Sequence, residues 1–312
     1  MSDIRERALL VKVSTAKFGT QRKDQAATRQ TADDQNAEKA SVSVTKSLIP
    51  KNNPQLKALV RQMSAVSNLF RFMTGPWDEN FRIISAKKYG KLREALDAHL
   101  MTVEELKDDL RQALPAILAD APRHLGNMYD ENQYPDIDTI IDAFRITIDT
   151  EVIPDRSKHI LVGLDDDRVE KLISDANSKD NQRAKELHTH THGVVSDALT
   201  NMISSLENFG DGIENSNRTK TFRDTLVSNM ADVADVLKGL NISNDPALDK
   251  LADDIIDNLT SASAPILRGD KIKGDNRTAE MIEKDAADLR KEISGKAKEI
   301  ADDLDGVFGI AS

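Results

Sequence analysis

The chain has 312 residues, of which 39% are hydrophobic and 31% charged, with a formal net charge of −10 and no cysteine. The lack of cysteine excludes a disulfide framework, a cysteine-ligated zinc site and a cysteine nucleophile. Aromatic residues make up only 4% of the chain, so aliphatic side chains must supply most of the core, which suits the packing of helix on helix.

The charge is unevenly distributed. Residues 1–100 carry 18 Lys and Arg against 10 Asp and Glu, whereas residues 101–312 carry 25 against 43. This asymmetry either orients the protein toward a charged partner or reflects solvated helix faces of different composition. No apolar run approaches the roughly 20 residues of a membrane span, and the charged N-terminus lacks the apolar core of a signal peptide. We therefore expect a cytoplasmic protein.

Three stretches alternate apolar and polar residues with the period of two that is typical of β-strands. They lie near residues 9–16, 42–48 and 144–153. We expect them to form one small antiparallel sheet with a buried and a solvated face. The third stretch has the clearest pattern, and the side chains expected on its buried face are Phe144, Ile146, Ile148 and Val152. Residues 159–164 are a further candidate strand, and residues 19–40 are expected to form a loop or a weak helix.

The first half also contains amphipathic helices with a 3.6-residue apolar period. Pro54 opens the first of them, and the sequence TGPWDEN at residues 74–80 ends it. Helix resumes near residue 84. The capping-box pattern at Thr102 predicts a second helix start within this stretch, and Pro115 and Pro122 are expected to interrupt or kink it.

Beyond about residue 165 the pattern is helical throughout. Residues 165–209 predict a single helix of about forty residues, whose apolar stripe is dense only from Leu187 onward. Heptad-like helices follow, and Asp245 with Pro246 marks the start of one of them. Residues 261–276 are expected to form a loop, followed by a charged last helix that ends near residue 305.

These elements predict a mainly α protein, an elongated antiparallel helical bundle or coiled coil with a small antiparallel β-sheet at one end. We expect three consecutive parts. They are an α+β part with the sheet and a helical hairpin over residues 1–164, a long coiled-coil part over residues 165–264, and a loop with a charged helix over residues 265–312.

The sequence HTHTH at residues 188–192 is the strongest candidate for a metal site. On a helix, His188 and His192 share a face, whereas His190 points about 200° away. His188 and His192 would flank the apolar seam through Leu187 and Thr191, and His190 would lie outside it. At most His188 and His192 could share one ion, and a third ligand would have to come from elsewhere. We predict no metal, no cofactor and no catalytic residue, and keep this pair as the metal candidates.

Aromatic and basic side chains gather around the break at residues 74–80. The interaction candidates there are Trp77, Phe81, Arg82, Lys87 and Lys88. Such side chains can stack on bases and neutralise phosphates, so this group favours contact with nucleic acid or protein. The structural alternative is that Trp77 closes the end of a helix pair.

Three longer stretches occur in a fixed order: LFRFMTGPWDENFRIISAKKYGKLREAL, YPDIDTIIDAFRITIDTEVIPD and TFRDTLVSNMADVADVLKGLNISNDPALDKLADDI. Together they resemble the phage and bacterial family numbered 3150 among domains of unknown function, over roughly residues 8–260. None of the shared motifs is catalytic, so the resemblance implies no active site. It implies a phage, prophage or plasmid origin and a gene neighbourhood with AAA+ ATPases of the MoxR type.

The chain lacks the glycine-rich nucleotide motifs and the G-x-S-x-G motif of hydrolases, and we predict that it is not an enzyme. The leading hypothesis is a mobile-element scaffold or adaptor that acts through helical protein–protein contacts, with an AAA+ ATPase or a second copy of itself among its partners. The second is a nucleic-acid-associated accessory protein that uses the basic first third. The third is a metal-dependent hydrolase at the histidine run. No hypothesis involves a membrane.

Overall fold

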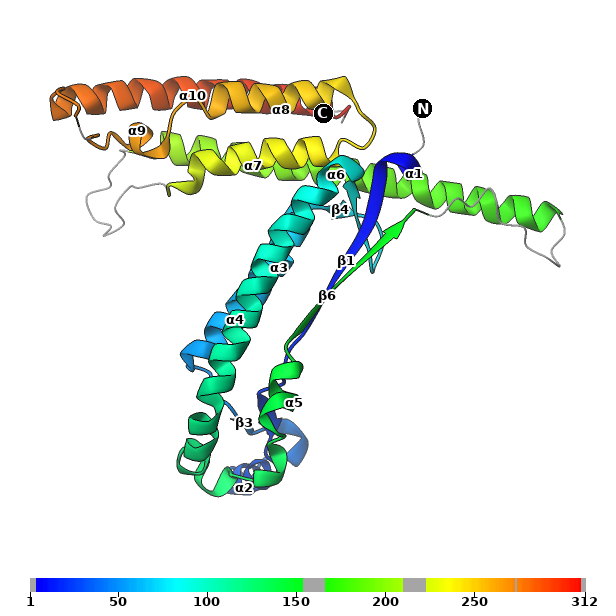
Figure 1. Ribbon diagram of the computed structural model, residues 1–312, viewed down its shortest axis with the longest axis vertical. Coiled ribbons are helices and arrows are strands. Elements are labelled where there is room, and N and C mark those ends of the chain that lie inside the picture. Colours follow the sequence, from blue (N-terminus) through cyan, green and yellow to red (C-terminus); the bar gives the residue numbers. More distant parts are fainter. Residues whose placement is uncertain (1–3, 154–165, 210–222, 273, 310–312) are drawn as a thin grey trace. The chain divides into compact units, whose positions relative to one another are not determined.

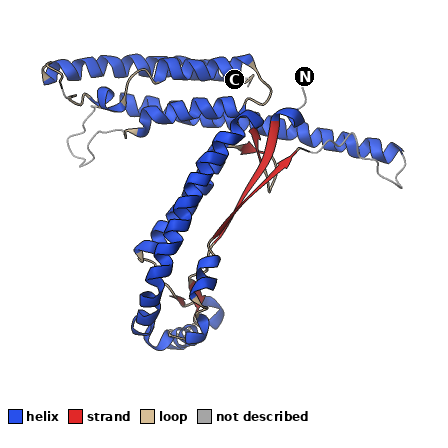
Figure 2. Cartoon of the chain, viewed as in Figure 1, coloured by secondary structure: helices blue, strands red, loops and turns tan. Residues whose placement is uncertain are grey.

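The structure, a computed structural model, describes residues 4–153, 166–209, 223–272 and 274–309. These residues are mainly α-helical with a small antiparallel sheet, as the sequence predicts (Figure 1, Figure 2). The helices of the described residues are α1 (Ile4–Arg7), α2 (Gln25–Asp34), α3 (Pro54–Met73), α4 (Ala86–Leu125), α5 (Ile137–Asp142), α6 (Asp166–Glu207), α7 (Thr225–Leu240), α8 (Pro246–Leu259), α9 (Ala264–Arg268) and α10 (Ala279–Val307). The strands are β1 (Ala8–Ala16), β2 (Gln21–Lys23), β3 (Thr45–Ser47), β4 (Gly75–Pro76), β5 (Arg82–Ser85) and β6 (Arg145–Val152).

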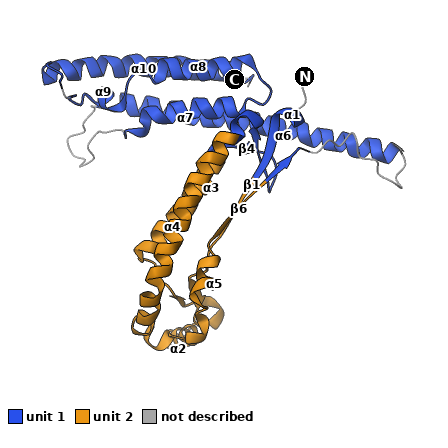
Figure 3. Ribbon diagram, viewed as in Figure 1, with its two compact units in different colours: residues 1–11, 72–89, 150–312 blue, residues 12–71, 90–149 orange. Residues whose placement is uncertain are grey.

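The chain forms two compact units (Figure 3). Unit 1 comprises residues 1–11, 72–89 and 150–312, and unit 2 comprises residues 12–71 and 90–149. The boundaries fall inside β1, α3, α4 and β6, so the units are not the three consecutive parts expected from the sequence. The reason is that strands far apart in the sequence pair with each other, and that the last helix packs with those before it. Residues 159–164, the further candidate strand, lie outside the described residues.

Four strands form the main sheet, in the order β4-β5-β1-β6. β1 and β6 correspond to the predicted strands near residues 9–16 and 144–153. β5 pairs with β1 in antiparallel register, with Ala8 opposite Ser85 and Val11 opposite Arg82. The sequence did not predict β5, because its adjacent buried residues Ile83 and Ile84 break the alternation that identifies a strand.

The stretch near residues 42–48 does not join this sheet. Within it, β3 pairs with β2 in a separate two-stranded sheet, with Lys46 opposite Arg22. Lys46 is the one buried side chain of β3, and its ammonium group forms an ion pair with Asp24 at 3.0 Å and donates to the carbonyl of Met128. The burial of Lys46 depends on these tertiary partners, so an apolar sequence pattern could not predict it.

Two helices of unit 2 differ from the prediction. The sequence left the first undecided between a loop and a weak helix, and it divided the second into two helices. Residues 25–34 form α2, whose N-cap Asp24 accepts a hydrogen bond from the backbone of Ala27 at 2.9 Å. α4 is continuous through Thr102, Pro115 and Pro122, so the predicted second start and interruption are wrong. The Thr102 hydroxyl donates to the carbonyl of Ala98 and therefore does not cap a new helix.

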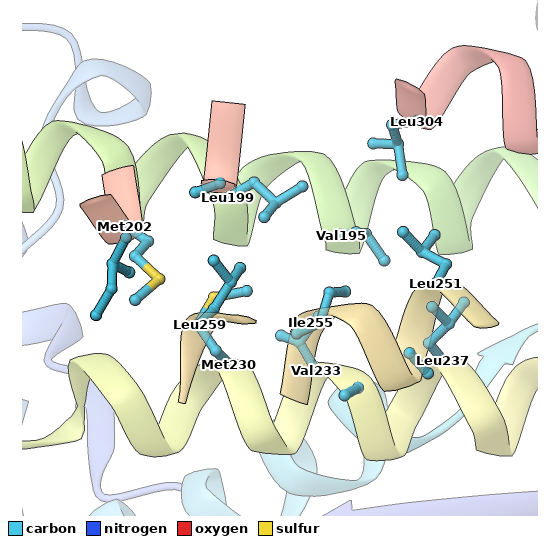
Figure 4. Packing of buried hydrophobic residues seen from close by; sticks show 14 of the residues in the cluster. Val195, Leu199, Met202, Met230, Val233, Leu237, Leu251, Ile255, Leu259 and Leu304 are labelled. Carbon is cyan, nitrogen blue, oxygen red and sulfur yellow. The ribbon is translucent and has the colours of Figure 1, made fainter. Parts of the chain in front are cut away.

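Four helices of unit 1 form an antiparallel bundle. α6 packs against α7 and α10, and α8 packs against the same two helices. Figure 1 shows α6 and α7 running side by side in opposite directions. In the core, side chains of all four helices point toward one another (Figure 4), including Leu199, Val233, Ile255 and Leu304. The predicted helix of about forty residues is confirmed, since α6 has 42 residues.

The C-terminal part of the chain belongs to this bundle. The ammonium group of Lys298 on α10 lies 2.5 Å from the carboxylate of Glu207 on α6, and the start of α8 is capped by Asp245 as predicted. The expected loop at residues 261–276 contains the short helix α9, which ends at Gly269 with φ of 75°. Five residues are too few for an apolar period to predict.

A second core of unit 1 lies between the sheet and the bundle. Its members are Ala8, Leu10, Trp77, Ile83, Ile153, Leu187, Val236, Leu240 and Ile242. Gly75 of β4 lies so close to Leu187 of α6 that a Cβ atom at position 75 would overlap the leucine Cδ1 atom. At the end of β6, Ile153 is buried while Val152 is 70% exposed. The prediction that Val152 faces the core is therefore wrong, because the alternation of exposed and half-buried residues in β6 ends after Asp149.

Candidate functional site

The continuous helix α6 places the three histidines around the seam that the sequence predicted. Leu187 and Thr191 are buried, and His188 and His192 lie next to them on one and the same side of the helix. Both imidazoles contact the ring of Phe308, which follows the last residue of α10, with ring centroids 4.8 Å apart for His188 and 5.3 Å for His192. These two histidines therefore pack α10 onto α6.

His192 also has a polar partner. Its Nε2 atom lies 2.8 Å from the Oδ1 atom of Asp305. The sequence did not assign Asp305 or Phe308 to this site, because the last helix was expected to end near residue 305. The sequence did contain a signal for Phe308, because this residue continues the apolar stripe of the last helix one turn beyond the buried Leu304.

His190 is the exception to the predicted arrangement. It does not lie outside the packed face, because the sheet of unit 1 packs against this side of α6. Its Nε2 atom is inaccessible and has no hydrogen-bond partner among the described residues. Burial, followed by the positive charge of Arg82, lowers the pKa of His190 from its ordinary value of 6.5. Both effects favour the neutral form of the imidazole.

The metal candidates His188 and His192 share an aromatic neighbour. Within the described ranges, no group of three or more His, Asp and Glu side chains is placed to hold a metal ion. The ring of Phe308, which both imidazoles contact, is not a metal ligand. The geometry of the run is thus that of a helix–helix contact.

Trp77 is buried in the core between the sheet and the bundle, with 4% of its surface exposed. The guanidinium group of Arg183 lies over its ring, 5.1 Å from the centroid. Arg183 also lies 3.1 Å from the carboxylate of Asp180, one turn earlier on α6. The indole thus packs under α6 and is not presented to solvent for stacking on a base.

The other four interaction candidates have different environments. Phe81 is half-buried against the same core as Trp77. Arg82 donates to the hydroxyl of Thr74 at 2.8 Å, and the ammonium group of Lys88 lies 2.5 Å from the carboxylate of Asp235. Of the five candidates, Lys87 is the one classed as exposed. The structure therefore places most of this group in packing and pairing within unit 1.

The basic excess of the first third does not produce a basic unit. In unit 2, residues 12–71 carry 11 Lys and Arg with 4 Asp and Glu, whereas residues 90–149 carry 6 with 13. The two segments fold together, so unit 2 has 17 charges of each sign and no net charge. The electrostatic attraction for a polyanion that the sequence suggested is therefore largely cancelled within the unit.

A hollow of about 550 Å³ lies between the end of α6 and α10. The guanidinium group of Arg290 lies 4.3 Å from the ring centroid of Phe209 and donates to the Leu267 carbonyl and to Glu283. Glu207 accepts hydrogen bonds from Lys298 and, more weakly, from Ser294, which lower the pKa of its carboxyl group. These charged groups join α6, α9 and α10 to one another.

The first half of α6 differs from the second. From Leu187 to Leu206 the helix contributes buried side chains to both cores of unit 1, whereas no described side chain from 167 to 186 is buried. Figure 1 shows this half continuing past the end of α7. Val169 and Ile173 are half-buried, and Leu172 between them is 50% exposed. The result is a long helical segment with a short apolar stripe near its N-terminal end, formed by Val169, Leu172 and Ile173.

Comparison of the chain with models of known protein families, with curated proteins and with solved structures finds no match. Among the described residues, no helix combines the length and the apolar character that crossing a membrane requires.

Proposed function

We propose that this protein is a non-enzymatic scaffold or adaptor that acts through helical protein–protein contacts. The observation that supports the proposal is the first half of α6, which extends for 21 residues from Asp166 to Glu186. Its described side chains are all exposed or half-buried, and of these Arg183 packs over Trp77. In proteins most helical stability comes from packing an amphipathic face against a neighbour. A partner helix that covers this stripe would supply that packing.

The chemistry of this half of α6 fits a helical partner. Val169, Leu172 and Ile173 have the spacing of three and four residues that a partner helix or groove recognises. The same 21 residues carry six acidic and five basic side chains, and mixed charges beside an apolar stripe set the choice and orientation of a partner in coiled coils. The contact surface therefore has an apolar centre with charged flanks.

The partner that we propose is an AAA+ ATPase of the MoxR type, encoded with this chain on a phage or another mobile element. Support for this partner comes from the family resemblance of the sequence and not from the geometry. The proposed setting is the cytoplasm of the bacterial host.

A binding measurement with the purified ATPase from the same genome tests the proposal. Replacing Leu172 and Ile173 by Glu puts two charges into the stripe and should weaken binding more than tenfold, because unpaired charges would be buried in the contact. The matched control replaces Ser174 and Ser178, both exposed and on the opposite side of the helix, by Glu. We expect the control to bind like the unmodified protein. Equal binding by all three proteins would place the contact elsewhere.

A further inference from the structure

β6 is the last strand of the four-stranded sheet, so one backbone edge of it has no neighbouring strand among the described residues. All eight residues of β6 are exposed or half-exposed. The unpaired N–H and C=O groups of such a strand form a template for another extended chain. The edge is therefore a candidate surface for strand addition.

The composition of β6 favours pairing. Proteins usually protect an exposed edge with charged side chains, lysine above all, with proline or with a very short strand. β6, with the sequence RITIDTEV, has eight residues and contains neither proline nor lysine, and its three charged side chains are of both signs. Five of its residues are β-branched, the kind of side chain that packs well across strands. Val152, at its end, is one of the large apolar side chains that the structure leaves exposed.

The charges of β6 indicate which strand would fit beside it. When two copies meet edge to edge in antiparallel orientation, opposite residues must point to the same side of the joined sheet, so both are odd-numbered or both even-numbered. With Ile148 on the two-fold axis, Arg145 of each copy lies opposite Glu151 of the other, and Thr147 lies opposite Asp149. Opposite charges that face each other across strands are favourable. This register pairs seven of the eight residues.

We propose that two copies of the chain associate through β6 and form one continuous eight-stranded sheet with a two-fold axis at Ile148. The contact is isologous, which is the usual form of a dimer interface. It goes beyond the proposed function, since it uses none of the exposed stripe on α6. The dimer would carry two such stripes, which would strengthen the binding of a multivalent partner.

Charge reversal with rescue tests the register. Arg145→Glu alone places like charges opposite each other at two symmetric positions and should raise the dimer dissociation constant roughly tenfold. Glu151→Arg alone should act similarly, and the double variant should restore the affinity because it exchanges the two charges. Lys51→Glu, at an exposed turn of unit 2, is the control for net charge. Sedimentation equilibrium of the full chain measures all four variants beside the unmodified protein.

Cysteine cross-linking gives an independent measurement, because the chain has no cysteine of its own. Ile148→Cys would place the two thiols on the symmetry axis, where opposite Cβ atoms are about 5 Å apart, and mild oxidation should give a covalent dimer. Val152→Cys is the control, since its two copies would lie about 27 Å apart.

Three outcomes would overturn the proposal. The first is a monomer at concentrations of about 100 μM, whether residues 159–164 of the same chain cover the edge or it stays open. The second is a dimer that neither single charge reversal weakens. The third is equal cross-linking at positions 148 and 152. A chain that does not dimerise through β6 could still bind the ATPase through its own α6. Failure of this proposal is therefore distinguishable from failure of the proposed function.

Discussion

His192 and Asp305 connect the middle of α6 to the last turn of α10, with 2.8 Å between the imidazole Nε2 and the carboxylate Oδ1. The carboxylate is 52% exposed, so solvent screens the pair. Phe308, which both His188 and His192 contact, is 4% exposed. The apolar contact therefore contributes more to holding the two helices together than the polar one does.

This difference predicts the ranking of two substitutions. Phe308→Ala should lower the free energy of unfolding by about 3 kcal/mol, because it removes a buried ring and leaves a cavity. Asp305→Ala should cost less than about 1 kcal/mol, as is usual for a partly exposed polar pair. Urea denaturation at pH 7.5 measures both. A larger effect of Asp305→Ala would mean that the site is primarily electrostatic.

His190 predicts a pH dependence of stability. Burial, and then Arg82, lower the pKa of His190 in the folded protein below its ordinary value of 6.5, so the unfolded chain binds the proton more readily. The contribution of this group to stability is therefore complete above pH 6.5 and is lost as the pH falls below it. His190→Gln removes this contribution while the other five histidines remain. We expect unfolding free energies measured from pH 7.5 to 5.5 to fall more steeply for the unmodified protein than for the variant. Parallel curves would contradict the lowered pKa.

The close approach of Gly75 to Leu187 predicts an unfavourable methyl group. Gly75→Ala should lower the free energy of unfolding by about 1–3 kcal/mol, because the new Cβ atom would overlap the leucine side chain. In a Leu187→Ala background the same glycine substitution should cost less, because the overlapping atoms are absent, although Leu187→Ala by itself leaves a destabilising cavity. Gly193→Ala is the control, because a Cβ atom at this position on α6 would meet nothing within 4 Å. It should raise the stability by about 0.5–1 kcal/mol. Thermal unfolding of these variants beside the unmodified protein tests this. Destabilisation by Gly193→Ala, with none by Gly75→Ala, would contradict the packing of α6.

The charge balance of unit 2 predicts weak attraction for nucleic acid. Its 17 basic residues are matched by 17 acidic ones, and the chain as a whole carries a net charge of −10. We expect no retardation of single- or double-stranded DNA in a gel-shift assay at low salt, where electrostatic binding is strongest. Retardation that disappears as salt increases would instead support the nucleic-acid hypothesis and would locate a basic surface that the overall charge conceals.

The sequence predicted the features that depend on local periodicity. The apolar stripes of α3, α6, α8 and α10 identify these helices because each buries one face against a neighbour. Asp245 with Pro246 correctly predicted the start of α8, since capping depends on residues that are adjacent in the sequence.

The sequence could not predict features that depend on distant partners. β5 follows from its pairing with β1, and the burial of Lys46 follows from Asp24 and Met128. His190 was expected outside the packed face, because nothing in its own helix indicates that the sheet covers it. For the candidate site, the positions of His188 and His192 beside the seam were predictable, but their shared contact with Phe308 was not.

Cross-linking in cells that express the protein tests the scaffold proposal most directly. Lys171, Lys179 and Lys185 lie on the exposed half of α6 and can react with an amine-specific cross-linker. We expect these lysines to form cross-links to an AAA+ ATPase of the MoxR type. Replacing Leu172 and Ile173 by Glu should abolish these cross-links and leave those within the bundle unchanged. Cross-links to the ATPase that persist in this variant, or that arise only from unit 2, would contradict the central role of α6.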